Sequence, residues 1–139
     1  MLPLHAKNEM ELIKQKEFGG CGVACLAMVT GKKYDQILSE IDDIFGRNLQ
    51  NDGLSDAEIV SYLSEQPGFK SVRSTTTRPD WRPAILTVPS LNYIGLLHYI
   101  VWDGERYLDP AIGSKTWPDD APVLKGKRII SWASAVIWD

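Results

Sequence analysis

The chain has 139 residues, of which 44% are hydrophobic and 24% are charged, so it is long enough for one domain with a buried core, which we expect to span residues 1–139. Its formal net charge of −3 and its scattered lysines and arginines argue against a nucleic-acid surface. The first residues do not resemble a secretory signal and no apolar run approaches the ~20 residues of a spanning helix, so we expect a soluble protein that is cytoplasmic or delivered as an effector.

The first half of the chain has the periodicity of helices. Residues Cys21–Thr30 are almost wholly apolar, which is typical of a buried central helix that Gly31 should end. An amphipathic helix is predicted over Tyr34–Phe45, because apolar residues recur three and four positions apart and Gly46 follows. A third helix is predicted from a capping box at Ser55-Asp56-Ala57-Glu58 to about Gln66, before Pro67-Gly68.

The second half has the composition of strands. Its runs are rich in β-branched and aromatic residues and are separated by glycine, proline and aspartate. In chain order, the predicted strands are Phe69–Thr77, Arg82–Val88, Leu96–Trp102, Glu105–Leu108 and Arg128–Trp138. Helices first and strands after indicate an α+β domain in which an antiparallel sheet packs on the early helices.

One segment of the second half predicts a β-hairpin. Asp103-Gly104 lies between two strand-like runs, and this dipeptide favours a two-residue type I′ turn. Pairing outward from that turn sets Trp102 opposite Glu105 and, four pairs further, His98 opposite Asp109. Since residues directly opposite have Cβ atoms roughly 4.5–5.5 Å apart, the turn predicts an imidazole beside a carboxylate.

The predicted contact between His98 and Asp109 has two interpretations. A carboxylate that accepts from one ring nitrogen fixes the tautomer and leaves the other nitrogen to take up a proton, as in a catalytic base. A pair that only stabilises the sheet would give the same pattern. Taken alone, the pattern favours the two interpretations about equally.

Cys21 is the candidate nucleophile. Glycines stand on both sides of it and allow another backbone to approach closely. It also begins the first predicted helix, where the positive end of the helix dipole favours a thiolate. Cys25, one turn deeper among apolar residues, is expected to be a core residue. These are the chain's two cysteines, and both are expected to be free thiols because their spacing on a helix suits a disulfide poorly.

Gln15 lies six residues before Cys21 and is a candidate oxyanion donor. An amide just upstream of a nucleophile at a helix start could hold an oxyanion together with the Cys21 backbone N–H. Lys14, Lys16 and Glu17 surround it, so by itself the pattern favours an ordinary surface glutamine.

Together these blocks resemble the bacteriocin-processing cysteine peptidases, whose papain-like domain cuts leader peptides after a double glycine. The resemblance lies in Gln-x5-Cys-Gly-Val-Ala-Cys-Leu-Ala-Met, in His-Tyr-Ile-Val and in Leu-Asp-Pro, and it covers most of the chain in motif order. It implies a papain-like cysteine peptidase fold with N-terminal helices packed on a C-terminal antiparallel sheet. The site it implies comprises Gln15 as oxyanion donor, Cys21 as nucleophile, His98 as base and Asp109 as orienting acid.

Two features depart from that family. Gly20 stands where the family usually has an acidic residue, directly before the cysteine. The 139 residues contain no exporter membrane domain, so we do not expect processing coupled to transport. Stand-alone domains of this kind include proteases, toxins, effectors and non-hydrolytic relatives.

Rival interpretations fall into two groups. A toxin, effector or acyltransferase that uses the same triad stays open, as does an inactive binding relative. A leader-peptide substrate is rejected, because Glu17 and Lys14 occupy positions where a leader ending at Gly20 needs apolar residues. A metal site is also rejected, because Cys-x3-Cys lies on one helix with neither histidine nearby in sequence. Its four ligands would be Cys21, Cys25, His5 and His98.

The sequence therefore predicts a hydrolase that cleaves a peptide or amide bond through Cys21, His98 and Asp109, with Gln15 at the oxyanion. Its partner would be a peptide or protein substrate, joined by a cognate inhibitor or immunity protein in a toxin system. We expect no cofactor, metal, nucleic acid or membrane partner. The substrate, the oligomeric state and the biological setting, bacterial or phage, do not follow from the sequence.

Overall fold

The computed structural model describes residues 10–17, 19–49, 53–75, 84–89, 97–102, 106–111, 116–118 and 131–136. Within these ranges the chain forms helices first and an antiparallel sheet after them, which confirms the predicted α+β class. Among the helices described, none is both long enough and apolar enough to cross a membrane.

The helices within the described ranges are α1 (Cys21–Thr30), α2 (Tyr34–Phe45) and α3 (Asp56–Ser64). The first two have the predicted bounds, because Gly31 (φ 80°) and Gly46 (φ 63°) adopt the left-handed conformation that ends a helix. All of α1 is buried, as expected of a central helix.

The predicted start of α3 is confirmed and its predicted end is wrong. Ser55 Oγ accepts from the Glu58 N–H at 3.1 Å and Glu58 Oε1 accepts from the Ser55 N–H at 2.9 Å, which is the predicted capping box. The helix ends at Ser64 rather than near Gln66. Gln66 precedes Pro67, a position that disfavours helical backbone, and its N–H bonds the Leu63 carbonyl three residues back.

In the part of the chain that the structure describes, six strands form one antiparallel sheet in the order β1-β6-β2-β3-β4-β5. They are β1 (Lys70–Thr75), β2 (Ala84–Pro89), β3 (Leu97–Trp102), β4 (Arg106–Leu108), β5 (Thr116–Pro118) and β6 (Ser131–Val136). Five of them overlap predicted strand segments, and β2 runs one residue past the predicted end at Val88. Phe69, the predicted start of the first strand, lies before β1, and the other predicted ends that the strands do not reach lie outside the described residues. The three-residue β5 is not predicted. The last strand along the chain, β6, lies between β1 and β2.

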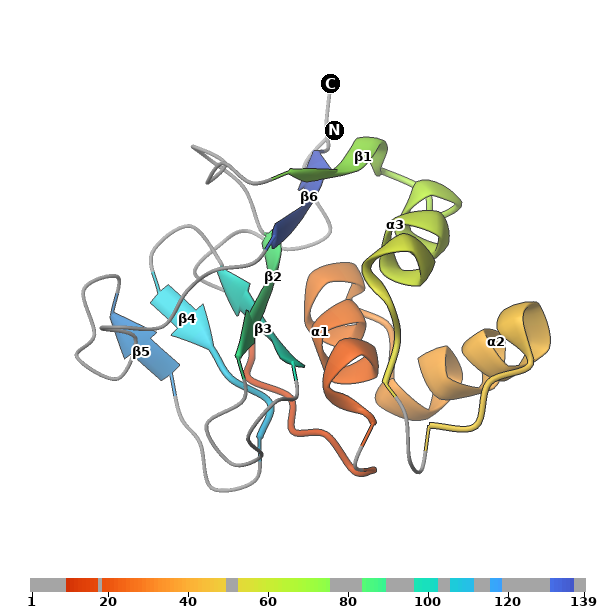
Figure 1. Ribbon diagram of the computed structural model, residues 1–139, viewed down its shortest axis with the longest axis horizontal. Helices are drawn as coiled ribbons and strands as arrows, with labels where there is room; N and C mark the ends of the chain where they lie inside the picture. The colour runs from red at the N-terminus through yellow and green to blue at the C-terminus, as the bar shows by residue number, and fades with distance from the viewer. Residues whose placement is uncertain are drawn as a thin grey trace.

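The three helices lie on one side of the sheet (Figure 1). α1 packs against β3, α3 packs against β1 and β6, and α2 packs on α1 at a greater distance from the sheet. Tyr99 and Val101 of β3 belong to the core that contains α1, whereas Leu86, Ile100 and Trp102 belong to a second buried cluster. The alternation of side chains along β2 and β3 therefore buries both faces of the sheet centre.

The register between β3 and β4 differs from the predicted one by two residues. Val101 pairs with Leu108 and Trp102 pairs with Tyr107, where the two-residue turn would set Trp102 opposite Glu105. The rings of Trp102 and Tyr107 lie 4.8 Å apart between centroids, and both residues are buried. This cross-strand aromatic pair stabilises the observed register by about 0.5–1.5 kcal/mol beyond its buried area.

The predicted pairing of His98 directly opposite Asp109 is therefore wrong. Asp109 follows the end of β4, and extending the observed register past that end sets it opposite Ile100, diagonal to His98. Because the register differs by an even number of residues, the two side chains keep the same face. The predicted turn residues, Asp103-Gly104, lie outside the described residues.

Candidate active site

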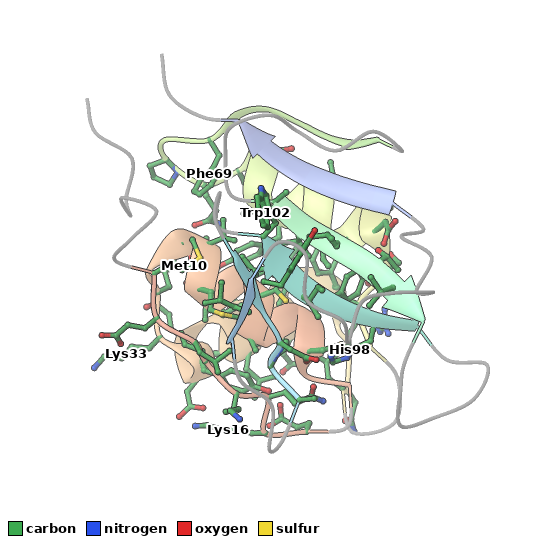
Figure 2. The ribbon with its side chains drawn as sticks, turned by 90° about the vertical axis from the view of Figure 1, so that its left-hand side faces the viewer. Met10, Lys16, Lys33, Phe69, His98 and Trp102 are labelled. Carbon is green, nitrogen blue, oxygen red and sulfur yellow. The ribbon has the colours of Figure 1, made fainter. Side chains whose placement is uncertain are left out.

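The predicted site residues meet at the N-terminal end of α1. There, the segment before α1 runs beside the backbone that follows β4 (Figure 1), and the Gln15 N–H donates to the Pro110 carbonyl at 2.9 Å. Gln15 is thereby fixed next to the turn that begins at Asp109. Figure 2 shows His98 and Trp102 at opposite ends of β3, with His98 toward this site.

His98 and Asp109 form a short, largely buried hydrogen bond. His98 Nε2 lies 2.7 Å from Asp109 Oδ1, and the two side chains are 13% and 17% exposed. The same Oδ1 accepts from the Ala111 N–H at 3.0 Å, which fixes the carboxylate. Because a carboxylate only accepts, Nε2 carries the proton of this bond and Nδ1 is the nitrogen that remains for Cys21.

The surroundings of His98 raise the pKa of its ring to about 9. Burial of the ring acts in the opposite direction and lowers the pKa. The hydrogen bond to Asp109 and the interactions with Cys21 outweigh burial, because both neighbours favour the imidazolium form. His98 is therefore a stronger base than a free imidazole and holds its proton throughout the neutral range.

Cys21 is the first residue of α1 and is 7% exposed. No side chain caps the start of α1, so the positive end of the helix is open toward the thiol. Gly22 brings α1 against Leu54, two residues before α3: a Cβ at Gly22 would lie 3.2 Å from Leu54 Cδ1. Cys25 differs from Cys21, because complete burial raises its pKa and Cys21 and Asp109 raise it further, which keeps it a thiol.

Gln15 is half-buried and attached to the turn that leads into Cys21. Its side-chain Nε2 donates to the Glu17 carbonyl at 3.0 Å, and the same carbonyl accepts from the Gly20 N–H at 3.0 Å. An amide nitrogen carries two N–H groups, so this bond uses one of them. The contact holds the Gln15 amide near the start of α1, which distinguishes it from a solvated surface glutamine.

A second aspartate site, missed from the sequence, lies next to the first. Asp56 Oδ1 accepts from Tyr99 Oη at 2.7 Å and from Thr87 Oγ1 at 2.9 Å, which connects the start of α3 to β2 and β3. Burial, the bond to Asp56 and the nearby Cys21 all raise the pKa of Tyr99 above its ordinary value. The sequence pattern did not predict this contact, because Asp56, Thr87 and Tyr99 lie on three elements that are far apart in the sequence.

No family model matches the chain, and no curated protein is detectably similar to it. Among the side chains that the structure describes, no three His, Cys, Asp or Glu residues come together as a group that could hold a metal ion. His5, one of the metal ligands weighed from the sequence, lies outside the described residues. The groups that the site brings together are a thiol, an imidazole, a carboxylate and an amide.

Proposed function

We propose that the protein is a papain-like cysteine hydrolase that cleaves a peptide or amide bond. The observation that carries the proposal is the position of His98, whose Nε2 is bonded to Asp109 while its ring interacts with Cys21. A thiol at a helix start, a base beside it and a carboxylate that orients the base form the nucleophile arrangement of cysteine hydrolases.

The first half of the reaction forms a thioester. In the resting pair His98 Nδ1 already holds the proton of the Cys21 thiol, and the Cys21 Sγ thiolate bonds to the carbonyl carbon of the substrate. The carbonyl oxygen becomes an oxyanion that the Gln15 amide and the Cys21 backbone N–H stabilise. The C–N bond then breaks, and the proton on Nδ1 passes to the leaving amine.

The second half releases the acyl group. Water attacks the thioester carbon while Nδ1 takes one of its protons, the C–S bond breaks, and that proton stays on Nδ1 beside the released Cys21 Sγ thiolate. Asp109 stays ionised and holds the imidazolium that forms in each half. The raised pKa of His98 suits this cycle, because a strong base can take the thiol proton and its conjugate acid can protonate an amine.

The family resemblance supports the same proposal. Bacteriocin-processing peptidases have the Gln–Cys, His and Asp–Pro blocks in this order, and α1, β3 and the turn after β4 carry them here. A central helix against an antiparallel sheet agrees with a papain-like arrangement. Gly20, which replaces the acidic residue of the family, is explained by packing: a Cβ there would lie 2.2 Å from Tyr34 Oη.

Trapping the thioester tests the proposal without knowledge of the substrate. The protein is incubated with a bacterial peptide digest, quenched in acid and fragmented by mass spectrometry to find acyl adducts. We expect adducts on Cys21 that disappear in Cys21→Ala and persist in Cys25→Ala, the matched control. Adducts that persist in Cys21→Ala, or their absence from the wild type, would refute the assignment.

A further inference from the structure

The hydroxyl of Tyr34, the first residue of α2, is bonded twice to the segment before the nucleophile. It accepts from the Lys16 N–H at 3.0 Å and lies 2.5 Å from Glu17 Oε1. Burial and the bond to Glu17 raise the pKa of Tyr34, so the hydroxyl keeps its proton and donates it to that carboxylate. One buried oxygen thus fixes two consecutive residues of a segment without secondary structure.

The same hydroxyl reaches the residue directly before Cys21. A Cβ built on Gly20 would lie 2.2 Å from Tyr34 Oη and 3.1 Å from Glu17 Oε1. Real Cβ atoms essentially never approach an oxygen so closely. The tyrosine hydroxyl and the glutamate carboxylate therefore occupy the space that a side chain before Cys21 would need.

Glu17 connects this contact to the predicted oxyanion donor. Its carboxylate accepts from Tyr34, while its backbone carbonyl accepts from Gln15 Nε2 and from the Gly20 N–H, both at 3.0 Å. The position of Glu17 therefore determines where the Gln15 amide lies relative to the start of α1. The Cys21 N–H, the second predicted oxyanion donor, directly follows the Gly20 that this turn fixes.

We propose that Tyr34, acting through Glu17, is the residue that positions the oxyanion hole formed by Gln15 and the Cys21 N–H. This inference rests on the proposed hydrolase function. Tyr34 is a positioning residue, because its hydroxyl bonds Lys16 and Glu17 and occupies the space that a side chain at Gly20 would need. Removing the hydroxyl slows steps that form an oxyanion and spares steps that need only the Cys21 nucleophile.

A second tyrosine provides a matched control. Tyr62 is buried, donates to Glu40 Oε1 at 2.6 Å, and has the Lys32 ammonium 5.8 Å from its ring centroid. Tyr34 has the Lys16 ammonium at 5.2 Å in the same arrangement. Tyr62 connects α3 to α2 and has no contact with the segment before Cys21 among those described. Tyr34→Phe and Tyr62→Phe therefore each remove a hydroxyl that donates to a glutamate, but only Tyr34 lies beside the segment before Cys21.

Two probes of Cys21 separate positioning from nucleophilicity. Iodoacetamide is displaced at a saturated carbon and forms no oxyanion, whereas p-nitrophenyl acetate acylates the thiol through a tetrahedral oxyanion. Both rates are measured on the full chain at pH 6 and corrected with Cys21→Ala. We expect Tyr34→Phe to lower acylation by about 10-fold, part of the ~10²–10³ that one oxyanion donor contributes, and to leave alkylation within about 2-fold. Tyr62→Phe should leave both rates within about 2-fold.

Variants of Glu17 keep the test decisive if Tyr34→Phe does not fold. Glu17→Ala should reproduce the selective loss of acylation, and Glu17→Gln, which still offers an oxygen to Tyr34, should restore it. Unchanged acylation in Tyr34→Phe and Glu17→Ala, or equal losses of both rates, overturns the inference alone, because Cys21 would still be reactive. A wild-type Cys21 that neither alkylates nor acylates overturns the proposed function and this inference with it.

Discussion

Two neighbouring residues of β3, His98 and Tyr99, are each bonded to an aspartate, and the proposed mechanism gives the two pairs different roles. Both bonds are 2.7 Å long and end on an Oδ1 atom, and both residues interact electrostatically with Cys21. Asp109 follows β4 and Asp56 begins α3. Proximity to the thiol therefore does not distinguish a catalytic pair from a structural one.

The difference lies in which proton can move. The pKa of His98 is about 9, so its ring is protonated at neutral pH and can give that proton to a leaving group, and it has a second nitrogen for the thiol. The pKa of Tyr99 is raised further above an already alkaline value, so its hydroxyl remains a fixed donor to Asp56. We infer that the first pair supports proton transfer and that the second fastens α3 to the sheet.

The largest expected effect separates the two aromatic residues directly. His98→Gln should lower the rate of Cys21 alkylation by iodoacetamide at pH 6 by about 100-fold, because the base is lost. Tyr99→Phe should keep that rate within about 3-fold, because no proton transfer uses its hydroxyl. Rates come from mass spectrometry of the alkylated chain, and equal losses in both variants would erase the distinction.

The two aspartates should differ next. Asp109→Asn should slow acylation by p-nitrophenyl acetate by roughly 10-fold to 100-fold, a part of the ~10²–10⁴ that acid–base catalysis contributes. Asp56→Asn keeps an oxygen for Tyr99 and Thr87 and should change the rate by less than about 3-fold. Stopped-flow release of nitrophenolate measures both. A loss in Asp109→Asn as complete as in Cys21→Ala would mean that Asp109 does more than orient His98.

The titration of His98 sharpens the comparison further. The chain has two histidines, so His5→Gln leaves His98 alone, and its ring proton can be followed by NMR. We expect a midpoint near pH 9 that falls toward the ordinary ~6.5 in Asp109→Asn and stays in Asp56→Asn. A midpoint near 6.5 in the His5→Gln parent would contradict the account.

The sign of the linked stability follows from that shift. The folded-state pKa of His98 lies above the unfolded value, so its contribution is fully present below about pH 6.5 and is lost as the pH rises through 9. The free energy of unfolding should therefore fall by an amount on the order of 1–3 kcal/mol across this range. Asp109→Asn should flatten the fall, as chemical denaturation at several pH values would show.

The smallest effect concerns the structural pair alone. Asp56→Ala removes the acceptor of two largely buried hydroxyls and should lower the free energy of unfolding by about 1–3 kcal/mol. Tyr99→Phe removes one donor and should cost about 1 kcal/mol. Urea denaturation measures both, and a stability unchanged by Asp56→Ala would show that this pair does not fasten α3.

Local signals made the helices predictable. Gly31 and Gly46 end α1 and α2 in the left-handed conformation, and the capping box at Ser55 and Glu58 starts α3. Each signal depends on residues within one turn of the helix, so one sequence is enough to interpret it. The end of α3 was missed because the effect of Pro67 on Gln66 begins the termination earlier.

The sheet was less predictable, because its pairing depends on distant residues. The Asp103-Gly104 dipeptide favoured a two-residue turn that would pair Trp102 with Glu105. In the structure Trp102 instead pairs with the buried Tyr107, so the register differs by two residues. The predicted contact of His98 with Asp109 nevertheless exists, since an even shift keeps the face. No sequence pattern within or next to β6 predicts that this strand lies between β1 and β2.

The contacts of Tyr34 and Asp56 were beyond sequence reasoning for the same reason. The hydroxyl of Tyr34 acts on residues 17 and 18 positions earlier, and Asp56 meets partners more than 30 positions later. In the sequence, Tyr34 is only an apolar position of an amphipathic helix. Gly20 was noticed in the sequence as a departure from the resembled family. Only the fold shows that the Tyr34 hydroxyl occupies the space that a side chain at this position would need.

The pH dependence of Cys21 alkylation tests the central claim most directly. The rate constant for iodoacetamide is measured from pH 5 to pH 9 in Cys25→Ala, where Cys21 is the single thiol. Because His98 holds the thiol proton, we predict substantial alkylation at pH 6 and a shallow rise above it. A rate that is negligible at pH 6 and climbs only with the ordinary alkaline ionisation of a thiol, near pH 8.5, would contradict the account.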